Sequence, residues 1–192
     1  FFAGFDGMLT ALKNSVIVAA MTMVMSILIG APAGYALSRF DFRGKELFRL
    51  LVLLTRAFPL PLLALPLAVL FIRVGLDDSA FGLALVHTTL AIPFAVLITF
   101  SLFSGIPVEL EEAAWTLGCN RLTAFTKVVL PLILPGVIAG AVLAFAKAMG
   151  EFGATITFVS NIPGQTQTLP SAIYTALQVP GQGETVARLA AL

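Results

Sequence analysis

The feature that most constrains this chain is a set of long stretches with almost no charged residue. A helix needs about 20 mostly apolar residues to cross the roughly 30 Å of hydrocarbon in a bilayer. Four candidate stretches lie between Lys13 and Arg39, Arg49 and Arg73, Asp78 and Glu109, and Lys127 and Glu151. With 59% hydrophobic and only 11% charged residues, the 192-residue chain could not cover a water-facing surface. The sequence predicts an all-α fold, a polytopic transmembrane helical bundle.

Basic residues predict which way the spans point. Six of the eleven Lys and Arg residues lie in the loops after the first and third spans: Arg39, Arg43, Lys45, Arg49, Arg121 and Lys127. Because positively charged loops tend to stay in the cytoplasm, we expect residues 1–13, 73–79 and 153–187 to lie outside the cell. Glutamine, asparagine and proline in the uncharged stretch 152–183 favour an external or re-entrant loop there.

The second span contains Pro59, Pro61 and Pro66, and each proline removes a backbone donor and disturbs the preceding turn. We expect this helix to be kinked or broken. Such a helix either lines the bundle interior, where other groups satisfy its freed carbonyls, or is kinked without any role in a pathway. Arg56 in the same span is either an anion attractor or a side chain that snorkels to the membrane boundary.

The remaining global features are less specific. A net charge of +1 gives no electrostatic argument for a nucleic-acid partner. Cys119 is the single cysteine and cannot form an internal disulfide. Because the chain starts at Phe1 and no signal peptide precedes the first apolar run, we expect it to be an interior excerpt that lacks terminal helices.

Between the third and fourth spans the pattern changes to that of short amphipathic helices. Leu110, Ala113, Ala114 and Leu117 recur at helical spacing. Pro107 suits the first turn of this helix, Gly118 suits the left-handed residue just past its end, and Asn120 suits the cap of a second short helix. Two such helices make a knob at the membrane surface that suits insertion into a groove of a soluble partner.

This loop carries a resemblance to a known family. Glu112-Ala113-Ala114, three residues, Gly118, nine residues and Val128-Val129-Leu130-Pro131 are similar to the EAA loop of permease subunits in ATP-binding-cassette (ABC) importers, with Val128 where the family pattern has Ile. The resemblance implies a type I importer fold, a single permease domain over residues 1–192 and a coupling loop at 105–130. The ATPase-coupling residues that it implies are Glu112, Ala113, Ala114, Gly118, Leu130 and Pro131.

The cargo implied by the resemblance differs along the chain. Residues from Asn14 to Pro107 are most similar to carbohydrate-type permeases, whereas the sequence from about Thr116 onward resembles a molybdate-type oxyanion permease. Molybdate or tungstate is therefore the first expectation and a sugar the alternative. An ATP-independent channel is the alternative from a different class.

The resemblance also implies the assembly. The chain would be a multi-pass subunit of the inner or plasma membrane, paired with a second permease subunit in a homo- or heterodimer. Two cytoplasmic ABC ATPases and an external substrate-binding protein would be its other partners. The sequence has no G-x-x-x-x-G-K-[ST] phosphate loop, so we expect no enzyme activity and no cofactor on this chain, with ATP and Mg on the partner ATPase.

Residues after the fourth span predict a substrate pathway. Glycine and hydroxyl side chains gather at Gly153, Thr155, Thr157, Ser160 and Asn161. Exposed backbone N–H groups and hydroxyl donors replace the water around a tetrahedral oxyanion. Sugars usually need aromatic faces as well, and the single Trp and two Tyr favour the oxyanion, although 16 Phe leave the sugar open.

Other polar residues within the spans have structural interpretations. His87, the only histidine, cannot form a metal cluster, and we expect it to be neutral and bonded to a neighbouring helix rather than facing an aqueous path. Lys147 and Glu151 are four residues apart and are expected to pair on one helix face, as a structural pair or as part of a gate. Gly136 and Gly140 predict close helix packing. No catalytic site and no metal site is predicted.

Overall fold

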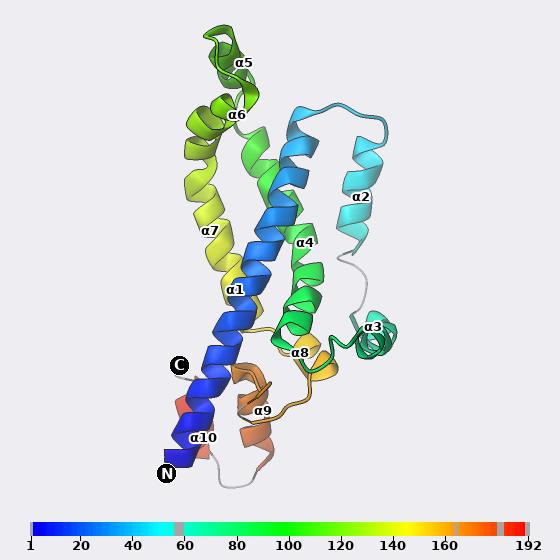
Figure 1. Cartoon of the computed structure of the whole chain (residues 1–192), viewed down its shortest axis with the longest axis vertical. Helices are drawn as coiled ribbons and strands as arrows, with labels where there is room; N and C mark the ends of the chain where they lie inside the picture. The colour runs from blue at the N-terminus through cyan, green and yellow to red at the C-terminus, as the bar shows by residue number, and fades with distance from the viewer. Residues whose placement is uncertain (1, 56–59, 164, 180–182, 191–192) are drawn as a thin grey trace. The chain divides into compact units, whose positions relative to one another are not determined.

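The computed structural model describes residues 2–55, 60–163, 165–179 and 183–190, and among these residues it contains helices and no strand (Figure 1). The elements are α1 (Phe2–Arg39), α2 (Lys45–Thr55), α3 (Leu60–Val74), α4 (Ala80–Ser104), α5 (Glu109–Thr116), α6 (Arg121–Ala124), the π-helical turn η1 (Phe125–Val129), α7 (Leu130–Met149), α8 (Gly153–Phe158), α9 (Leu169–Gln178) and α10 (Gly183–Ala190). The predicted all-α class is confirmed.

Within the described residues, three helical stretches are long and apolar enough to cross a membrane: Leu9–Arg39, Ala80–Ser104 and Arg121–Met149. They correspond to the first, third and fourth predicted spans. The second predicted span holds α2 and α3, with Pro66 inside α3. It also includes residues 56–59, where Arg56 and Pro59 lie outside the described part of the chain, so its interruption stays a prediction.

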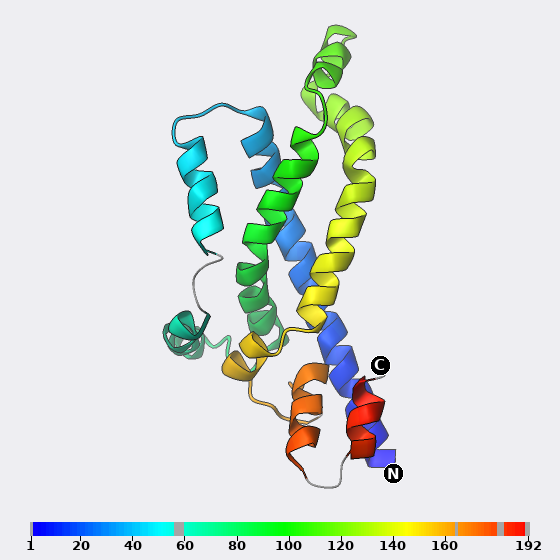
Figure 2. The same cartoon turned by 180° about the vertical axis from the view of Figure 1, so that it is seen from behind.

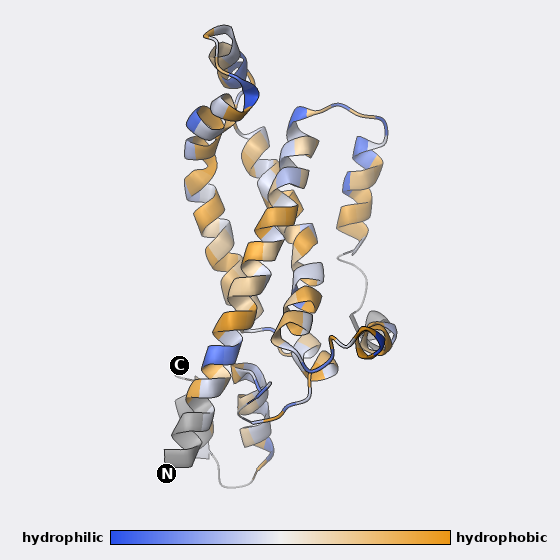
Figure 3. Ribbon diagram, in the orientation of Figure 1, coloured by the Kyte–Doolittle hydropathy of each residue, from blue (hydrophilic) through white to orange (hydrophobic). Residues whose placement is uncertain are grey.

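Contacts between residues divide the chain into two compact units. Unit 1 comprises residues 1–23, 58–89 and 144–192, and unit 2 comprises residues 24–57 and 90–143. In unit 2, apolar residues follow α7 and most of α2, whereas hydrophilic residues gather at the C-terminal end of α1 and around α5 and α6 (Figure 3). The prediction of a single permease domain over residues 1–192 remains untested.

Unit 2 is built on a close contact between α1 and α4 (Figures 1 and 2). A Cβ placed on Gly30 would lie 2.5 Å from the Cβ of Ala95, and one placed on Gly34 would overlap Thr99 Oγ1. Thr99 Oγ1 also donates a hydrogen bond to the Gly30 carbonyl at 2.9 Å. Gly30 and Gly34 are four residues apart, so this small-residue pair lets the two helix backbones approach each other.

Gly136 and Gly140 on α7, the pair predicted to allow close helix packing, differ in how closely a neighbouring side chain approaches them. A Cβ on Gly136 would overlap the side chain of Leu102 on α4, so the close packing predicted there is confirmed. A Cβ on Gly140 would meet Ile98 at 3.7 Å, an ordinary van der Waals distance. Only the first of the two glycines is therefore required by its neighbour.

In unit 1 the stretch expected to be a loop contains α8, α9 and α10. The sequence interpretation missed these helices because they are short and are separated by segments rich in proline and amide residues. Thr168 starts α9 with a capping arrangement in which its N–H donates to Ser171 Oγ at 3.0 Å. Ala172 and Ala176 then pack against Ala11 of α1, so tertiary contacts stabilise helices that the composition alone did not indicate.

The N-terminal part of α1 is tied to the segment before α9 by polar side chains. Asn14 Nδ2 donates to the carbonyls of Gln165 and Gln167 at 2.8 and 3.0 Å. Ser15 Oγ accepts from the N–H of Leu169 at 2.8 Å. The last of these bonds satisfies one of the first N–H groups of α9, which have no partner within the helix.

Candidate functional site

The predicted coupling loop forms a helical hairpin in unit 2, built from α5, Gly118 and α6. Gly118 has a φ of +87°, its N–H donates to the Trp115 carbonyl, and the Cys119 N–H donates to the Ala114 carbonyl, both at 3.0 Å. This bonding pattern satisfies carbonyls at the end of α5 and requires a left-handed residue. Asn120 Oδ1 accepts from the Thr123 N–H at 2.8 Å and caps α6. The predicted left-handed turn at Gly118 and the predicted helix cap at Asn120 are confirmed.

The helix after Asn120 is not the separate short helix that the sequence predicted. α6 continues through η1 into α7, so Arg121–Met149 is one helical stretch. Pro131 has no N–H to donate to the preceding turn, and η1 ends two residues before it. A π-helical turn accommodates such an interruption of the regular bonding pattern without ending the helix. The α5 helix is also shorter than expected and begins at Glu109, after Pro107.

The six predicted coupling residues lie in two places. Glu112, Ala113 and Gly118 are exposed on the hairpin, and Ala114 is buried beneath it. Leu130 and Pro131 are exposed in the first turn of α7. The hairpin thus brings four of the six together, while the last two mark the start of the adjoining helix.

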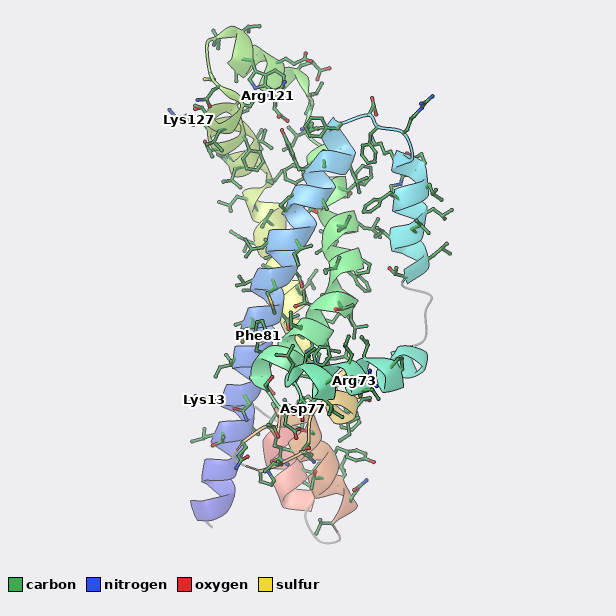
Figure 4. The ribbon with its side chains drawn as sticks, turned by 45° about the vertical axis from the view of Figure 1, so that its right-hand side comes forward. Lys13, Arg73, Asp77, Phe81, Arg121 and Lys127 are labelled. Carbon is green, nitrogen blue, oxygen red and sulfur yellow. The ribbon has the colours of Figure 1, made fainter. Side chains whose placement is uncertain are left out.

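Large apolar side chains project from the hairpin. The exposed fraction is 85% for Leu117 and 72% for Leu122. The Arg121 guanidinium lies over the Trp115 ring, 5.6 Å from its centroid, and both Arg121 and Lys127 lie at this end of unit 2 (Figure 4). Exposed apolar groups beside basic ones are typical of a surface that another protein covers.

The hairpin also contains a buried charge that the sequence interpretation missed. Glu111 is 1% exposed, and its carboxylate lies 2.5 Å from Arg39 Nε and accepts a hydrogen bond from the Tyr35 hydroxyl at 2.8 Å. Arg39 also donates to the Ile106 carbonyl at 3.2 Å. The ion pair therefore joins the end of α1 to α5 and to the turn that precedes it.

A signal for Glu111 was present in the helical spacing. Glu111 is three residues before Ala114, so it shares the face of α5 on which Ala114 is buried. Tyr35 and Arg39 are likewise four residues apart on one face of α1. What the spacing could not supply was the pairing of these two faces, which are 72 residues apart in the chain.

Aromatic side chains surround this ion pair. The Tyr35 ring packs edge to face against Phe103 and Phe125, with ring centroids 5.1 and 5.3 Å apart. A cavity of about 510 Å³ opens beside the cluster. Its lining includes Pro32, Phe40, Val108 and Leu122 in addition to the ion pair and the aromatic rings.

The predicted substrate-pathway residues lie in unit 1, and the polar side chains among them are already hydrogen bonded within the protein. Thr155 is buried, and its hydroxyl donates to the Glu151 carbonyl at 2.7 Å. Its oxygen is 3.2 Å from His87 Nε2, so the single hydroxyl proton leaves His87 as the donor of that second bond. The expectation that His87 is bonded to a neighbouring helix is confirmed.

The other four pathway residues lie on α8 and just after it. The Thr157 hydroxyl donates to the Gly153 carbonyl at 2.8 Å. Ser160 donates from both its N–H and its hydroxyl to the Asp78 carboxylate. Asn161 Nδ2 donates to Thr175 at 2.6 Å, while its buried Oδ1 accepts no hydrogen bond among the described residues. These donors are held within the protein rather than left open.

Two charged groups precede this segment. Lys147 Nζ lies 3.7 Å from the Glu151 carboxylate, so the predicted pairing on one helix face is confirmed. Arg73 lies in the last turn of α3 and Asp77 in the connection from α3 to α4, also in unit 1 (Figure 4). Among the residues that the structure describes, no group of three or more His, Cys, Asp or Glu side chains is placed to hold a metal ion.

Comparisons with known proteins agree with the interpretation of the hairpin. Residues 26–182 match the family described as binding-protein-dependent transport system inner membrane component. The molybdenum transport system permease protein ModB of Escherichia coli is 52% identical over 56% of this chain and 47% of its own length. ModB of Haemophilus influenzae is 38% identical over 94% of this chain and 85% of its own length.

A permease with a different cargo also matches. The sulfoquinovosyl glycerol transport system permease protein SmoH of Agrobacterium fabrum is 38% identical over 84% of this chain and 56% of its own length. Among solved structures, a bacterial ABC transporter involved in the import of the acidic polysaccharide alginate superposes with a TM-score of 0.72 at 22% identity, over 96% of this chain and 64% of that one. The last comparison concerns the fold alone. The chain spans about half the length of the Escherichia coli relative.

Proposed function

Because this chain belongs to the family of binding-protein-dependent transport system inner membrane components, we propose that it is the permease subunit of an ATP-driven importer of molybdate or tungstate. It is a multi-pass protein of the inner membrane. Transport follows alternating access, in which closure of ATPases on the cytoplasmic side reorients the permease. The chain itself provides the path and catalyses no reaction.

The observation that carries this proposal is the hairpin of α5, Gly118 and α6. It presents Glu112, Ala113 and Gly118 at its surface, with Leu117 and Leu122 exposed beside them. A short helix with exposed apolar side chains suits a groove on a soluble partner. We place one ATPase subunit on each permease hairpin, so a permease dimer holds two ATPases that bind ATP and Mg.

The cargo is proposed from the relatives and from the chemistry of α8. Two of the three permeases compared above are named for molybdenum transport, and the hydroxyl-rich segment from Gly153 to Asn161 suits an oxyanion. The residues proposed for the pathway are Gly153, Thr155, Thr157, Ser160 and Asn161. To donate to cargo, Thr157 and Ser160 would exchange a bond within the protein for a bond to the oxyanion.

A sugar is the second candidate, and the match to the sulfoquinovosyl glycerol permease supports it. Sulfoquinovosyl glycerol carries both a sugar ring and an anionic group. A site for such a cargo would need aromatic surface in addition to hydroxyl donors. Phe152 and Tyr174, with ring centroids 4.8 Å apart next to α8, are an aromatic pair in unit 1 that would supply it.

The test is ATP hydrolysis by the reconstituted full assembly. The full-length permease, its ATPase and its external binding protein are placed in lipid vesicles, and hydrolysis is measured with molybdate, tungstate, sulfoquinovosyl glycerol or maltose. We expect molybdate and tungstate to stimulate hydrolysis and uptake. Stimulation by either sugar alone would replace the oxyanion, and uptake that continues without the ATPase would establish a channel instead.

Cys119 tests the sidedness on which ATPase docking depends. It lies in the hairpin and is partly exposed. In intact cells a membrane-impermeant maleimide should not label it, whereas inside-out vesicles stripped of ATPase should react. Labelling from outside intact cells would reverse the topology and remove the docking role.

A further inference from the structure

The three acidic residues in the first turn of α5 have different environments. Glu109 and Glu112 are exposed, while Glu111 is buried against α1. The Glu111 carboxylate uses one oxygen for Arg39 at 2.5 Å and the other for the Tyr35 hydroxyl at 2.8 Å. Both partners belong to the last two turns of the first span, so one carboxylate connects the coupling hairpin directly to that span.

Arg39 extends this connection to the start of the hairpin. Its Nε contacts Glu111, and its terminal nitrogen donates to the Ile106 carbonyl at 3.2 Å, just after α4. Its side chain is 8% exposed and that of Glu111 is 2% exposed. The Arg39 guanidinium thus has two fixed acceptors, one on α5 and one just after α4. Because charge-assisted hydrogen bonds are directional, these bonds hold the rotation of α5 about its own axis.

Stability alone does not account for a buried ion pair at this position. Burying two charges carries a desolvation penalty, and well-packed apolar residues are often as stable or more stable in their place. A cavity of about 510 Å³ also opens beside the cluster. The polar contacts of Glu111 connect α5 directly to the end of α1.

We infer that Tyr35, Arg39 and Glu111 form a permanent link through which the coupling hairpin and the cytoplasmic end of the first span move as one body. The inference rests on the proposed function, because it assigns the hairpin to an ATPase. When the ATPases close, the displacement of α5 passes through Glu111 to Arg39 and then along α1. These three are positioning residues, which contact neither the cargo nor the nucleotide.

The test measures the cargo transported per ATP hydrolysed in the reconstituted full assembly, with molybdate as cargo. Glu111→Gln keeps the shape of the side chain and removes its charge. We expect the ratio of cargo to ATP to fall about tenfold, within the range of coupling between distant sites. Glu46→Gln is the matched control, because Glu46 pairs with Arg49 at 3.2 Å on an exposed surface of α2. An unchanged ratio in Glu111→Gln overturns the link.

A second variant separates linkage from stability. Arg39→Met with Glu111→Met replaces the ion pair by apolar side chains of similar length, and the melting temperature of the assembly is measured beside the transport ratio. We expect the double variant to melt closer to the wild-type temperature than Glu111→Gln does. The ratio of cargo transported to ATP hydrolysed should stay as low as in Glu111→Gln. Recovery of both would mean that the pair is merely structural and would overturn the inference.

Tyr35→Phe provides an independent arm if the double variant does not assemble. It keeps the ring contacts with Phe103 and Phe125 and removes only the hydrogen bond to Glu111. A lowered ratio at an unchanged melting temperature supports the link, and an unchanged ratio contradicts it. Molybdate uptake by the wild-type assembly is measured first, and its absence refutes the proposed function. If the wild type transports molybdate, a normal ratio of cargo to ATP in the variants refutes the link alone.

Discussion

The coupling hairpin of unit 2 and the polar segment from Gly150 to Asn161 in unit 1 both place polar groups within an apolar chain, but they satisfy them differently. In the hairpin, Glu111 and Arg39 form a buried ion pair between residues 72 positions apart. In the polar segment, the hydroxyls of Thr155 and Thr157 donate to carbonyls four residues earlier in the chain.

This difference distinguishes a region that is fixed to its neighbour from one whose hydrogen bonds can be exchanged. Breaking a buried ion pair leaves a charge without a partner, so the hairpin is tied firmly to α1. A hydroxyl that returns to its own helical turn exchanges one modest bond for another. This difference fits the proposed function, in which the hairpin transmits a displacement and Thr157 exchanges its bond within the protein for one to the anion.

The largest effect that would test this comparison is expected at Glu111. Glu111→Ala leaves the Arg39 guanidinium buried without its partner, which should lower the free energy of unfolding by about 3–5 kcal/mol. Denaturant or SDS unfolding of the purified full-length subunit measures it. Glu46→Ala, at a side chain 71% exposed, is the control and should change the free energy by less than about 0.5 kcal/mol. Equal effects of the two variants would remove the distinction between the hairpin and the surface.

Gly34→Ala asks whether helix packing holds unit 2 as firmly as the ion pair does. The added Cβ would overlap Thr99 Oγ1 and lie 2.6 Å from the Phe100 nitrogen. Overpacking of this kind should lower the free energy of unfolding by about 1–3 kcal/mol. Gly140→Ala is the control, since its Cβ meets Ile98 at an ordinary distance. A loss at Gly34 larger than that at Glu111 would make packing the dominant contribution.

Gly118→Val tests whether the hairpin turn serves coupling rather than folding alone. A side chain with a Cβ in the left-handed region costs about 1–2 kcal/mol. Gly44 has a φ of +90° against +87° at Gly118, and both have open space for a Cβ. The two valine variants should therefore be equally strained, but only Gly118→Val should reduce uptake per ATP. Wild-type coupling in Gly118→Val would contradict the docking role.

The smallest effects are expected in the polar segment. Thr155→Val removes a hydroxyl that bonds both the Glu151 carbonyl and His87, and should lower the free energy of unfolding by about 1 kcal/mol. Thr157→Val, on an exposed side chain, should leave stability unchanged. Both should reduce molybdate uptake if these hydroxyls line the pathway. Normal uptake by both variants would move the pathway away from α8.

Local features of the hairpin were predictable from sequence, and long-range ones were not. Gly118 and Asn120 act on backbone groups within a few residues, so their neighbours in the chain reveal their roles. Glu111 depends on Arg39, and charged residues are ordinarily expected at the surface. Spacing puts Glu111 on the same face of α5 as Ala114, but only the fold shows that this face is buried and supplies the partner that makes the burial of Glu111 favourable.

The same reasoning explains the outcome in unit 1. The amide of Asn14 caps no local helix, and its acceptors at Gln165 and Gln167 lie about 150 residues away in sequence. The helices α8 to α10 are 6 to 10 residues long, too short to be stable alone, so their stability comes from such contacts and from packing on α1. Hydropathy predicts long spans reliably because bilayer thickness sets their length, and it carries no comparable signal for α8 to α10.

The π-helical turn η1 determines how the hairpin is oriented on α7. A regular helix rotates by about 100° for each residue, and a π-helical turn closes its hydrogen bonds over one more residue than an α-helical turn does. Removing one residue between Phe125 and Val129 would therefore rotate α6, Gly118 and α5 by about 100° relative to α7. The direction in which the hairpin faces is thus encoded in the length of the chain before Pro131, independently of which side chains it carries.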